Sequence, residues 1–376
     1  MSYYQKLGIS PIINAMGTMT MLGGSRIHPK AVEAMVAVSQ EFVDLNALLI
    51  AAGVRIAELT RAPAAHICTG AAAGIALTVA ACMTGTDEAK IQQLPQTYSM
   101  RYEVILDGAQ CNPFQHSIPI TGASIVEVGG GDSPMNRRGL EAALSERTAA
   151  VFYFVAWAHP DGLPLDLVIE IAHAAGVPVI VDAAAQLPPA DNLWNYTEMG
   201  ADLVIFSGGK DIRGPQTAGF ILGRSDLIEA CRLNGNPHEA TIGRAMKTSK
   251  EDIVGLVVAL EQYLQKDFES EMENYEKLVE QMRTMFAGIP HLNAYRVCPA
   301  PPDIQPNTIP RLYVDPDPKL AVDILKLKDH LLKGDPGIAV AMSPTGLIVN
   351  PQTLTMDEAV IVVRRIGEEI AALQRD

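Results

Sequence analysis

Short apolar runs alternate with helix-like segments through the middle of the chain. The runs are rich in β-branched residues and show no regular alternation with polar positions, which is typical of strands buried on both faces. Helical periodicity separates them, for example over Leu165–Ala175, where Gly176 suits the position just after a helix. This order predicts an α/β fold with a mostly parallel sheet. The predicted strands are His66–Thr69, Glu103–Leu106, Ser124–Val128, Ala150–Ala156, Pro178–Asp182, Leu203–Ser207 and Gly219–Leu222.

The C-terminal part of the chain has a different pattern. Residues Lys250–Phe286 are charged and periodic, with an apolar stripe that includes Leu256 and Leu260, and they predict one or two long helices. The stretch Val297–Pro318 is rich in proline and predicts loops or an edge strand. Helical spacing of apolar residues returns over Thr355–Gln374.

These patterns predict two domains and a leading segment. We expect residues 30–250 to form a large α/β domain and residues 251–376 a smaller α+β domain that begins with the long linking helix. Residues 1–29 are expected to pack on the small domain.

Composition indicates a globular chain with a large core: 48% of the 376 residues are hydrophobic and 19% are charged. A net charge of -14 opposes binding to phosphate backbones, so we expect no nucleic-acid partner. Five cysteines without a CxxC pair and an N-terminus without a signal-peptide pattern favour the cytoplasm. The histidines lack metal-ligand spacing. The uncharged stretch Ala62–Thr86 is rich in alanine and predicts a buried helix, not a membrane span.

A glycine-containing turn after the first predicted strand is a candidate anion site. Thr69 and Gly70 lead into a helix of small residues, whose first N–H groups lack partners within the helix and favour an anion. A helix with small residues for close packing would give the same pattern, and no Walker lysine follows the glycines.

Two charged residues follow other predicted strands. Asp182 ends an apolar strand, where ligands bind in open parallel sheets, although a turn or N-cap aspartate is the alternative. Lys210 follows a strand and two glycines that allow close approach to a ligand, although a solvated loop lysine would fit the same pattern. A desolvated lysine there can lose its proton and form an imine.

An anion site, an acid for a pyridinium nitrogen and an imine-forming lysine together match what pyridoxal 5'-phosphate (PLP) requires. At these residues the chain resembles the fold-type I PLP-dependent enzymes, with a large PLP-binding domain and a smaller C-terminal domain. It is most similar to the selenocysteine-synthase-like branch that includes D-glucosaminate-6-phosphate ammonia-lyase. The motifs that carry the resemblance are TGAAAGIAL, VDAAAQLPP, SGGKDIRGPQ and IGRAMKTSKE, and it extends over nearly the whole chain.

The resemblance implies roles for individual residues. Lys210 would carry PLP as a Schiff base, and Asp182 would pair with the pyridine nitrogen. We expect the residue that stacks on the ring to follow the predicted strand Glu103–Leu106, where Gln110, Phe114 and His116 remain alternatives. The other cofactor-binding residues expected are Thr69, Gly70, Ala71, Ser207 and Gln186.

Substrate contacts are expected from local cations, because the overall charge is negative. The candidates are Arg213 and a group formed by Arg244, Lys247 and Lys250. That group has the alternative of being a solvated helix start. Asn14 and Thr18, in the opening motif INAMGT, would line the same pocket, or form a turn packed on the small domain.

The resemblance implies a lyase that performs α,β-elimination on a polar amino acid, such as an amino-sugar acid phosphate, with release of ammonia and a 2-oxo acid. A racemase or an aldolase would use the same residues and remains an alternative. Selenium transfer to seryl-tRNA is a distant alternative, which the charge of -14 disfavours. Related enzymes share active sites between subunits, so we also expect a homodimer or larger assembly.

Overall fold

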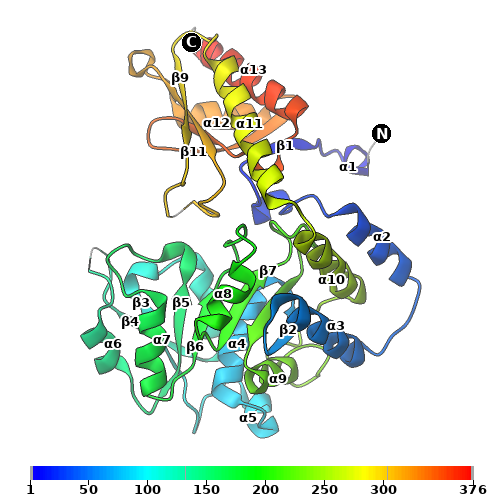
Figure 1. Cartoon of the computed structure of the whole chain (residues 1–376), viewed down its shortest axis with the longest axis vertical. Coiled ribbons are helices and arrows are strands. Elements are labelled where there is room, and N and C mark those ends of the chain that lie inside the picture. The colour runs from blue at the N-terminus through cyan, green and yellow to red at the C-terminus, as the bar shows by residue number, and fades with distance from the viewer. Residues whose placement is uncertain (1–2, 132, 303, 374–376) are drawn as a thin grey trace. The chain divides into compact units, whose positions relative to one another are not determined.

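A computed structural model describes residues 3–131, 133–302 and 304–373 (Figure 1). The chain divides into two compact units. The large unit is Ile27–Gln265, and the small unit combines Met1–Arg26 with Lys266–Asp376.

The large unit is built on a sheet with the order β2-β8-β7-β6-β5-β3-β4. All neighbouring strands are parallel except β8, which runs antiparallel to both β2 and β7. This confirms the predicted α/β fold with a mostly parallel sheet. The strands are β2 (Ala64–Cys68), β3 (Glu103–Asp107), β4 (Ser124–Val128), β5 (Thr148–Phe154), β6 (Val179–Asp182), β7 (Leu203–Ser207) and β8 (Gly219–Gly223).

The apolar runs become central strands because both of their faces are covered. Every residue of β5, β6 and β8 is buried. Ile75 and Val79 of helix α4 share a core with Phe152 and Ile205 of the sheet. The helices of this unit are α2 (Pro29–Val38), α3 (Leu45–Thr60), α4 (Gly70–Thr84), α5 (Glu88–Gln93), α6 (Arg137–Ala143), α7 (Leu165–Ala174), α8 (Asn192–Glu198), α9 (Ser225–Asn234) and α10 (Lys250–Leu264), with 3-10 turns at Gly108–Gln110, Pro113–Ser117, Pro119–Thr121 and Val155–Trp157.

Two local predictions are confirmed in this unit. Gly176 ends α7 with a φ of +68°, and its N–H donates to the carbonyl of His173 over 2.9 Å. The uncharged stretch after β2 forms α4, which is buried along most of its length. Among the described residues, no helix has the length and apolar character needed to span a membrane.

The small unit contains a second sheet with the order β1-β11-β12-β10-β9. Strand β1 of the N-terminal segment pairs in parallel with β11, and the other pairs are antiparallel. The strands are β1 (Ile12–Ala15), β9 (Leu292–Val297), β10 (Arg311–Pro316), β11 (Gly337–Met342) and β12 (Leu347–Val349). The helices are α1 (Tyr3–Lys6), α11 (Phe268–Phe286), α12 (Ile324–Lys333) and α13 (Met356–Leu373), with 3-10 turns at Thr20–Leu22, Pro318–Leu320 and Pro351–Thr353.

The structure differs from the sequence prediction at two places. The proline-rich stretch contains β10, which lies between β12 and β9 and is not an edge strand. This is compatible with its prolines because residues 311–315 contain none. The two units divide after Gln265, one helix later than the predicted boundary at residue 250, because α10 packs on α2 and α3.

Candidate active site

Three segments of the large unit meet where β2 and β7 end. Cys68 and Ser207, the last residues of these strands, both pair with Gly219 at the start of β8. A Cβ added to Gly219 would lie 2.9 Å from the Gly70 Cα, so only glycine allows the turn after β2 to come this close. The predicted phosphate residues Thr69, Gly70 and Ser207 are therefore brought together.

The first turn of α4 is open to an anion. Thr69 stands at the N-cap, but its side chain makes no capping hydrogen bond. Gly70 has a φ of +74°, and nothing lies within 4 Å of the Cβ that another residue would place there. The helix therefore begins with N–H groups that no N-cap side chain occupies, beside open space, and this arrangement fits a phosphate group.

Asp182 and Lys210 lie at the same edge of the sheet, where Asp182 is buried and Lys210 is half-buried. Asp182 ends β6 opposite Ile205 of β7, and its Oδ1 accepts a hydrogen bond of 2.8 Å from the N–H of Ala184. Burial raises the pKa of Asp182, while the hydrogen bond from Ala184 and the charge of Lys210 oppose that rise. Burial lowers the pKa of Lys210, and the charge of Asp182 opposes that change. The two groups are thus close enough to influence each other's titration.

The remaining predicted cofactor residues differ in their surroundings. The Nε2 of Gln186 is buried without a hydrogen-bond partner, so it can donate to a bound group. Gln110 is also buried, and its Oε1 accepts a hydrogen bond of 2.8 Å from the N–H of Phe154. His116 is exposed, and the ring of Phe114 lies 5.6 Å from that of Trp157. The ring-stacking residue stays a prediction.

The predicted substrate cations also differ. Lys250 fastens α10 to the end of α2, because its Nζ donates to the carbonyl of Val38 over 2.8 Å. Within the described part of the chain, no hydrogen bond or ion pair engages the side chain of Arg244 or Lys247. Arg213 is exposed with a φ of +59°, and its carbonyl accepts from the N–H of His28.

Asn14 and Thr18 belong to the small unit. The Nδ2 of Asn14 donates to the carbonyl of Gly17 over 2.8 Å, and its Oδ1 accepts from the N–H of Met16 over 2.9 Å. These bonds close the turn after β1, which favours the structural alternative for Asn14. Thr18 is half-buried.

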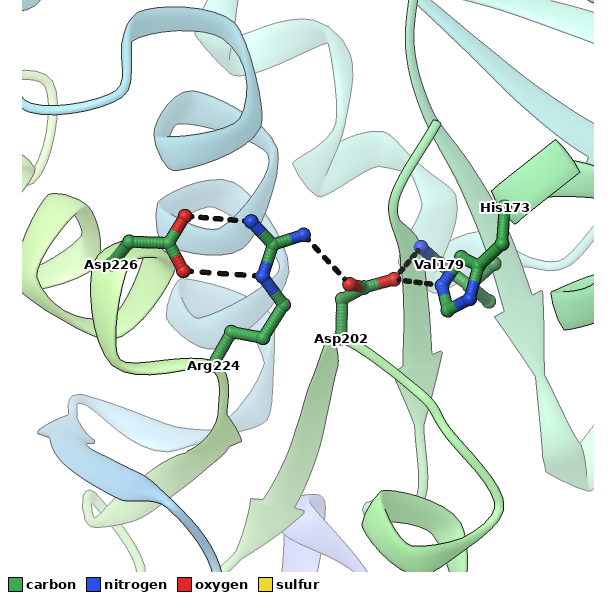
Figure 2. Close-up of polar contacts among 5 residues, drawn as sticks. All are labelled: His173, Val179, Asp202, Arg224 and Asp226. Carbon is green, nitrogen blue, oxygen red and sulfur yellow. Dashed lines mark hydrogen bonds and ion pairs between the residues drawn. The ribbon is translucent and has the colours of Figure 1, made fainter. Parts of the chain in front are cut away.

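A second polar cluster lies at the amino ends of β6 and β7, at the opposite edge of the sheet from Asp182 (Figure 2). Asp202 accepts hydrogen bonds of 2.8 Å from the N–H of Val179 and 2.9 Å from the Nη1 of Arg224, and it lies 2.8 Å from the Nε2 of His173. Arg224 also binds Asp226 through two nitrogens. The cluster connects α7, the sheet and α9 by hydrogen bonds. Within it, the side chain of His173 on α7 has Asp202 as its polar partner.

Sequence analysis overlooked two residues at the active-site edge. The Oγ1 of Thr69 donates to the carbonyl of Met246 over 2.8 Å and lies 3.0 Å from the Oγ1 of Thr248. Both partners belong to the motif IGRAMKTSKE, in which the sequence analysis names only the cations as candidate site residues. Met246 acts through its backbone, so no side-chain signal could have revealed it.

Known proteins are similar to this chain in sequence and in fold. The family model of L-seryl-tRNA selenium transferase matches residues 118–287. A 5'-C-glycyluridine monooxygenase-decarboxylase from Streptomyces sp is 34% identical over 97% of this chain and 91% of its own. A D-glucosaminate-6-phosphate ammonia lyase from Salmonella typhimurium is 39% identical over 70% of each chain. A solved structure of a D-glucosaminate-6-phosphate ammonia-lyase has a TM-score of 0.85 and 32% identity over 99% of both chains.

The fold and the site together define a PLP-dependent enzyme of fold type I. Within that class the chain belongs to the selenocysteine-synthase-like family, and it is an enzyme of the ammonia-lyase type. A serine palmitoyltransferase from S. paucimobilis, with a TM-score of 0.60 and 14% identity, shares the fold alone. PLP is the cofactor, and the open first turn of α4, the unpartnered Gln186 amide and the Asp182–Lys210 pair fit it.

Proposed function

We propose that the protein catalyses α,β-elimination on a polar amino acid that carries a distal anion, such as an amino-sugar acid phosphate. Ammonia and a 2-oxo acid would be the products. The observation that carries the proposal is the match to an ammonia-lyase structure over 99% of both chains, with the buried Asp182 and the half-buried Lys210 at the expected edge of the sheet.

Lys210 is suited to move the proton of the elimination. Burial lowers the pKa of Lys210 and so favours the neutral amine, whose Nζ would accept the proton from the substrate Cα. Bound PLP would supply an electron sink for the electrons of that C–H bond, and the Asp182 carboxyl would pair with its ring nitrogen. The β-hydroxyl would leave as water when it takes up the proton that Lys210 received from Cα. The unsaturated amine that is released would then be hydrolysed by one water molecule to a 2-oxo acid and ammonia.

Arg244 and Lys247 would bind the distal anion. Lys247 stands between the two residues that hydrogen-bond Thr69, and Arg244 precedes Met246 by two positions, which supports a place for both near the predicted phosphate site. A guanidinium and an ammonium without other partners can grip a phosphate or carboxylate by charge-assisted hydrogen bonds. This remote contact would orient the reacting bond without taking part in the chemistry.

A substrate panel tests the proposed reaction. Amino acids with and without a β-hydroxyl and a distal phosphate are incubated with the holoenzyme, and ammonia and 2-oxo acid are measured. Lys210→Ala serves as the control and should release neither. Deuterium exchange at Cα without a 2-oxo acid would indicate a racemase, and release of an aldehyde would indicate an aldolase.

A second candidate reaction follows from the monooxygenase-decarboxylase, whose similarity covers 97% of this chain. We propose oxygen-dependent decarboxylation of a glycyl-nucleoside as the alternative to elimination. Oxygen uptake and CO₂ release from a 5'-C-glycyl nucleoside would support it, and their absence, together with ammonia release in the panel, would exclude it. The L-seryl-tRNA(Sec) selenium transferases are more distant: one from Nitratidesulfovibrio vulgaris is 28% identical over 67% of this chain.

We also propose that the protein forms a homodimer through α2, α3 and the segment that connects these two helices. Large apolar side chains are exposed there, namely Val32, Val36, Phe42, Val43, Ile50 and Val54. Such a concentration is typical of protein interfaces. Sedimentation should show a dimer that Phe42→Glu weakens, whereas Tyr98→Glu, also at an exposed ring, should have no effect.

We propose the cytoplasm as the compartment. The five cysteines are free, and burial raises the pKa of Cys68 to about 12, so its thiol stays protonated. Cell fractionation of the native host, with a cytoplasmic marker as reference, tests this location.

A further inference from the structure

A short segment that carries Arg244 and Lys247 is joined to Thr69, the residue before α4. Residues 243–250, here called the cationic strap, are held at both ends. The N–H of Gly243 donates to the carbonyl of Asn234 over 2.9 Å, and the Nζ of Lys250 donates to the carbonyl of Val38 over 2.8 Å. Between these points, only Met246 and Thr248 hydrogen-bond to Thr69 among the described contacts.

The hydroxyl groups of Thr69 and Thr248 have defined roles because each carries a single proton. Thr69 gives its proton to the carbonyl of Met246, so it must accept in the 3.0 Å contact with Thr248. Thr248 is therefore the donor. It is 5% exposed, so water has little access to compete for this hydrogen bond.

This pairing sets the direction of the Thr69 side chain at the start of α4. A threonine at the N-cap ordinarily accepts hydrogen bonds from the N–H groups of the first turn. Here the Thr69 hydroxyl donates to Met246 and accepts from Thr248, and no side-chain cap forms. These two contacts hold the Thr69 side chain towards residues 246–248 and away from the first turn of α4. The first-turn N–H groups remain available for the phosphate.

We propose that Thr248 is a positioning residue that joins the cationic strap to Thr69. Thr69, Gly70 and the first turn of α4 are here called the cofactor cradle. By holding the Thr69 hydroxyl, Thr248 keeps the first turn of α4 open for the phosphate of PLP. By the same bond it fixes Arg244 and Lys247 beside that phosphate, where they meet an anionic group of the substrate. The second half of this inference rests on the proposed function, and the first half does not.

Cofactor binding tests the first half directly. The full-length protein is stripped of cofactor, and the affinities for PLP and for pyridoxal, which lacks the phosphate, are measured by absorbance and fluorescence. Thr248→Val should weaken PLP binding about two- to tenfold, the loss expected for one hydrogen bond, and leave pyridoxal binding unchanged. Thr248→Ser keeps the hydroxyl and should restore PLP binding.

A matched control separates this effect from a general loss of stability. Thr60 is fully buried, and its Oγ1 donates to the carbonyl of Ile56 over 2.8 Å, away from the cradle. Thr60→Val removes one buried hydrogen bond and should bind PLP as the unchanged protein does. If Thr248→Val cannot be purified folded, Thr248→Ala gives the same comparison.

The outcomes are distinguishable. Unchanged PLP affinity in Thr248→Val, or an equal loss of affinity for pyridoxal and PLP, would overturn the proposed role of Thr248 at the phosphate turn. If no substrate yields ammonia but Thr248→Val still loses affinity for PLP and not for pyridoxal, the proposed function fails. The role of Thr248 in cofactor binding then stands. With an active substrate, Thr248→Val should raise KM for the anionic compound with little change in kcat at saturating PLP, and an unchanged KM would overturn the substrate half.

Discussion

Replacing Gly219 by alanine should close the cofactor cradle without touching any reacting group. The new Cβ would lie 2.8 Å from the carbonyl carbon of Gly70, 2.9 Å from its Cα and 2.9 Å from the carbonyl oxygen of Phe206. All three are backbone atoms, so no side-chain rotation relieves the contact. Either β8 moves away from the sheet or the turn at Gly70 shifts.

The cost can be placed within limits. Overpacking by one methyl group in a close-packed region typically costs about 1–3 kcal/mol, and three backbone contacts favour the upper part of this range. Urea denaturation should therefore show the loss in free energy of unfolding. Because the displaced element is the phosphate turn, the affinity for PLP should fall more than the affinity for pyridoxal.

A matched glycine shows whether the close approach is the cause. Gly288 has no neighbour closer than 3.5 Å to an added Cβ, so Gly288→Ala should leave both stability and PLP affinity nearly unchanged. The reasoning is refuted if Gly219→Ala unfolds at the same urea concentration as the unchanged protein and binds PLP equally well. A stability loss with equal weakening of PLP and pyridoxal would show that the strain is absorbed away from Gly70.

Three further predictions concern charges. Asp202→Asn removes one charged acceptor oxygen from the cluster in Figure 2. Because Asp202 is buried while Arg224 is half-exposed, the free energy of unfolding should fall by about 2–3 kcal/mol. Urea denaturation measures this loss, and an unchanged midpoint would contradict it. Arg244→Ala should lower kcat/KM for the anionic substrate by roughly tenfold to a thousandfold, but not for an uncharged analogue; equal losses for both would argue against a charge contact. Burial lowers the pKa of His66 to about 4, so the unfolded chain binds its proton first and stability is lost as pH falls from about 6.5 towards 4. His66→Gln should flatten that acid loss in denaturation curves, and an identical pH dependence would contradict it.

Several features of this protein are determined locally and were therefore predictable from the sequence. Buried parallel strands need continuous apolar runs, so the sheet and the positions of Asp182 at the end of β6 and Lys210 after β7 follow from the pattern. Gly176 ends α7 because only a residue that tolerates a positive φ fits there. The family motifs then indicated the cofactor.

Other features were decided only by the tertiary structure, because they depend on residues far apart in the chain. The proline-rich stretch contributes an inner strand, since β9 and β12 both offer backbone partners to β10. Helix α10 belongs to the large unit because it packs on α2 and α3. The open cradle needs Gly219 and Thr248, which lie about 150 residues or more from Thr69 in the chain. Local propensity carries no information about such contacts, and only the packed fold brings these atoms within hydrogen-bond distance.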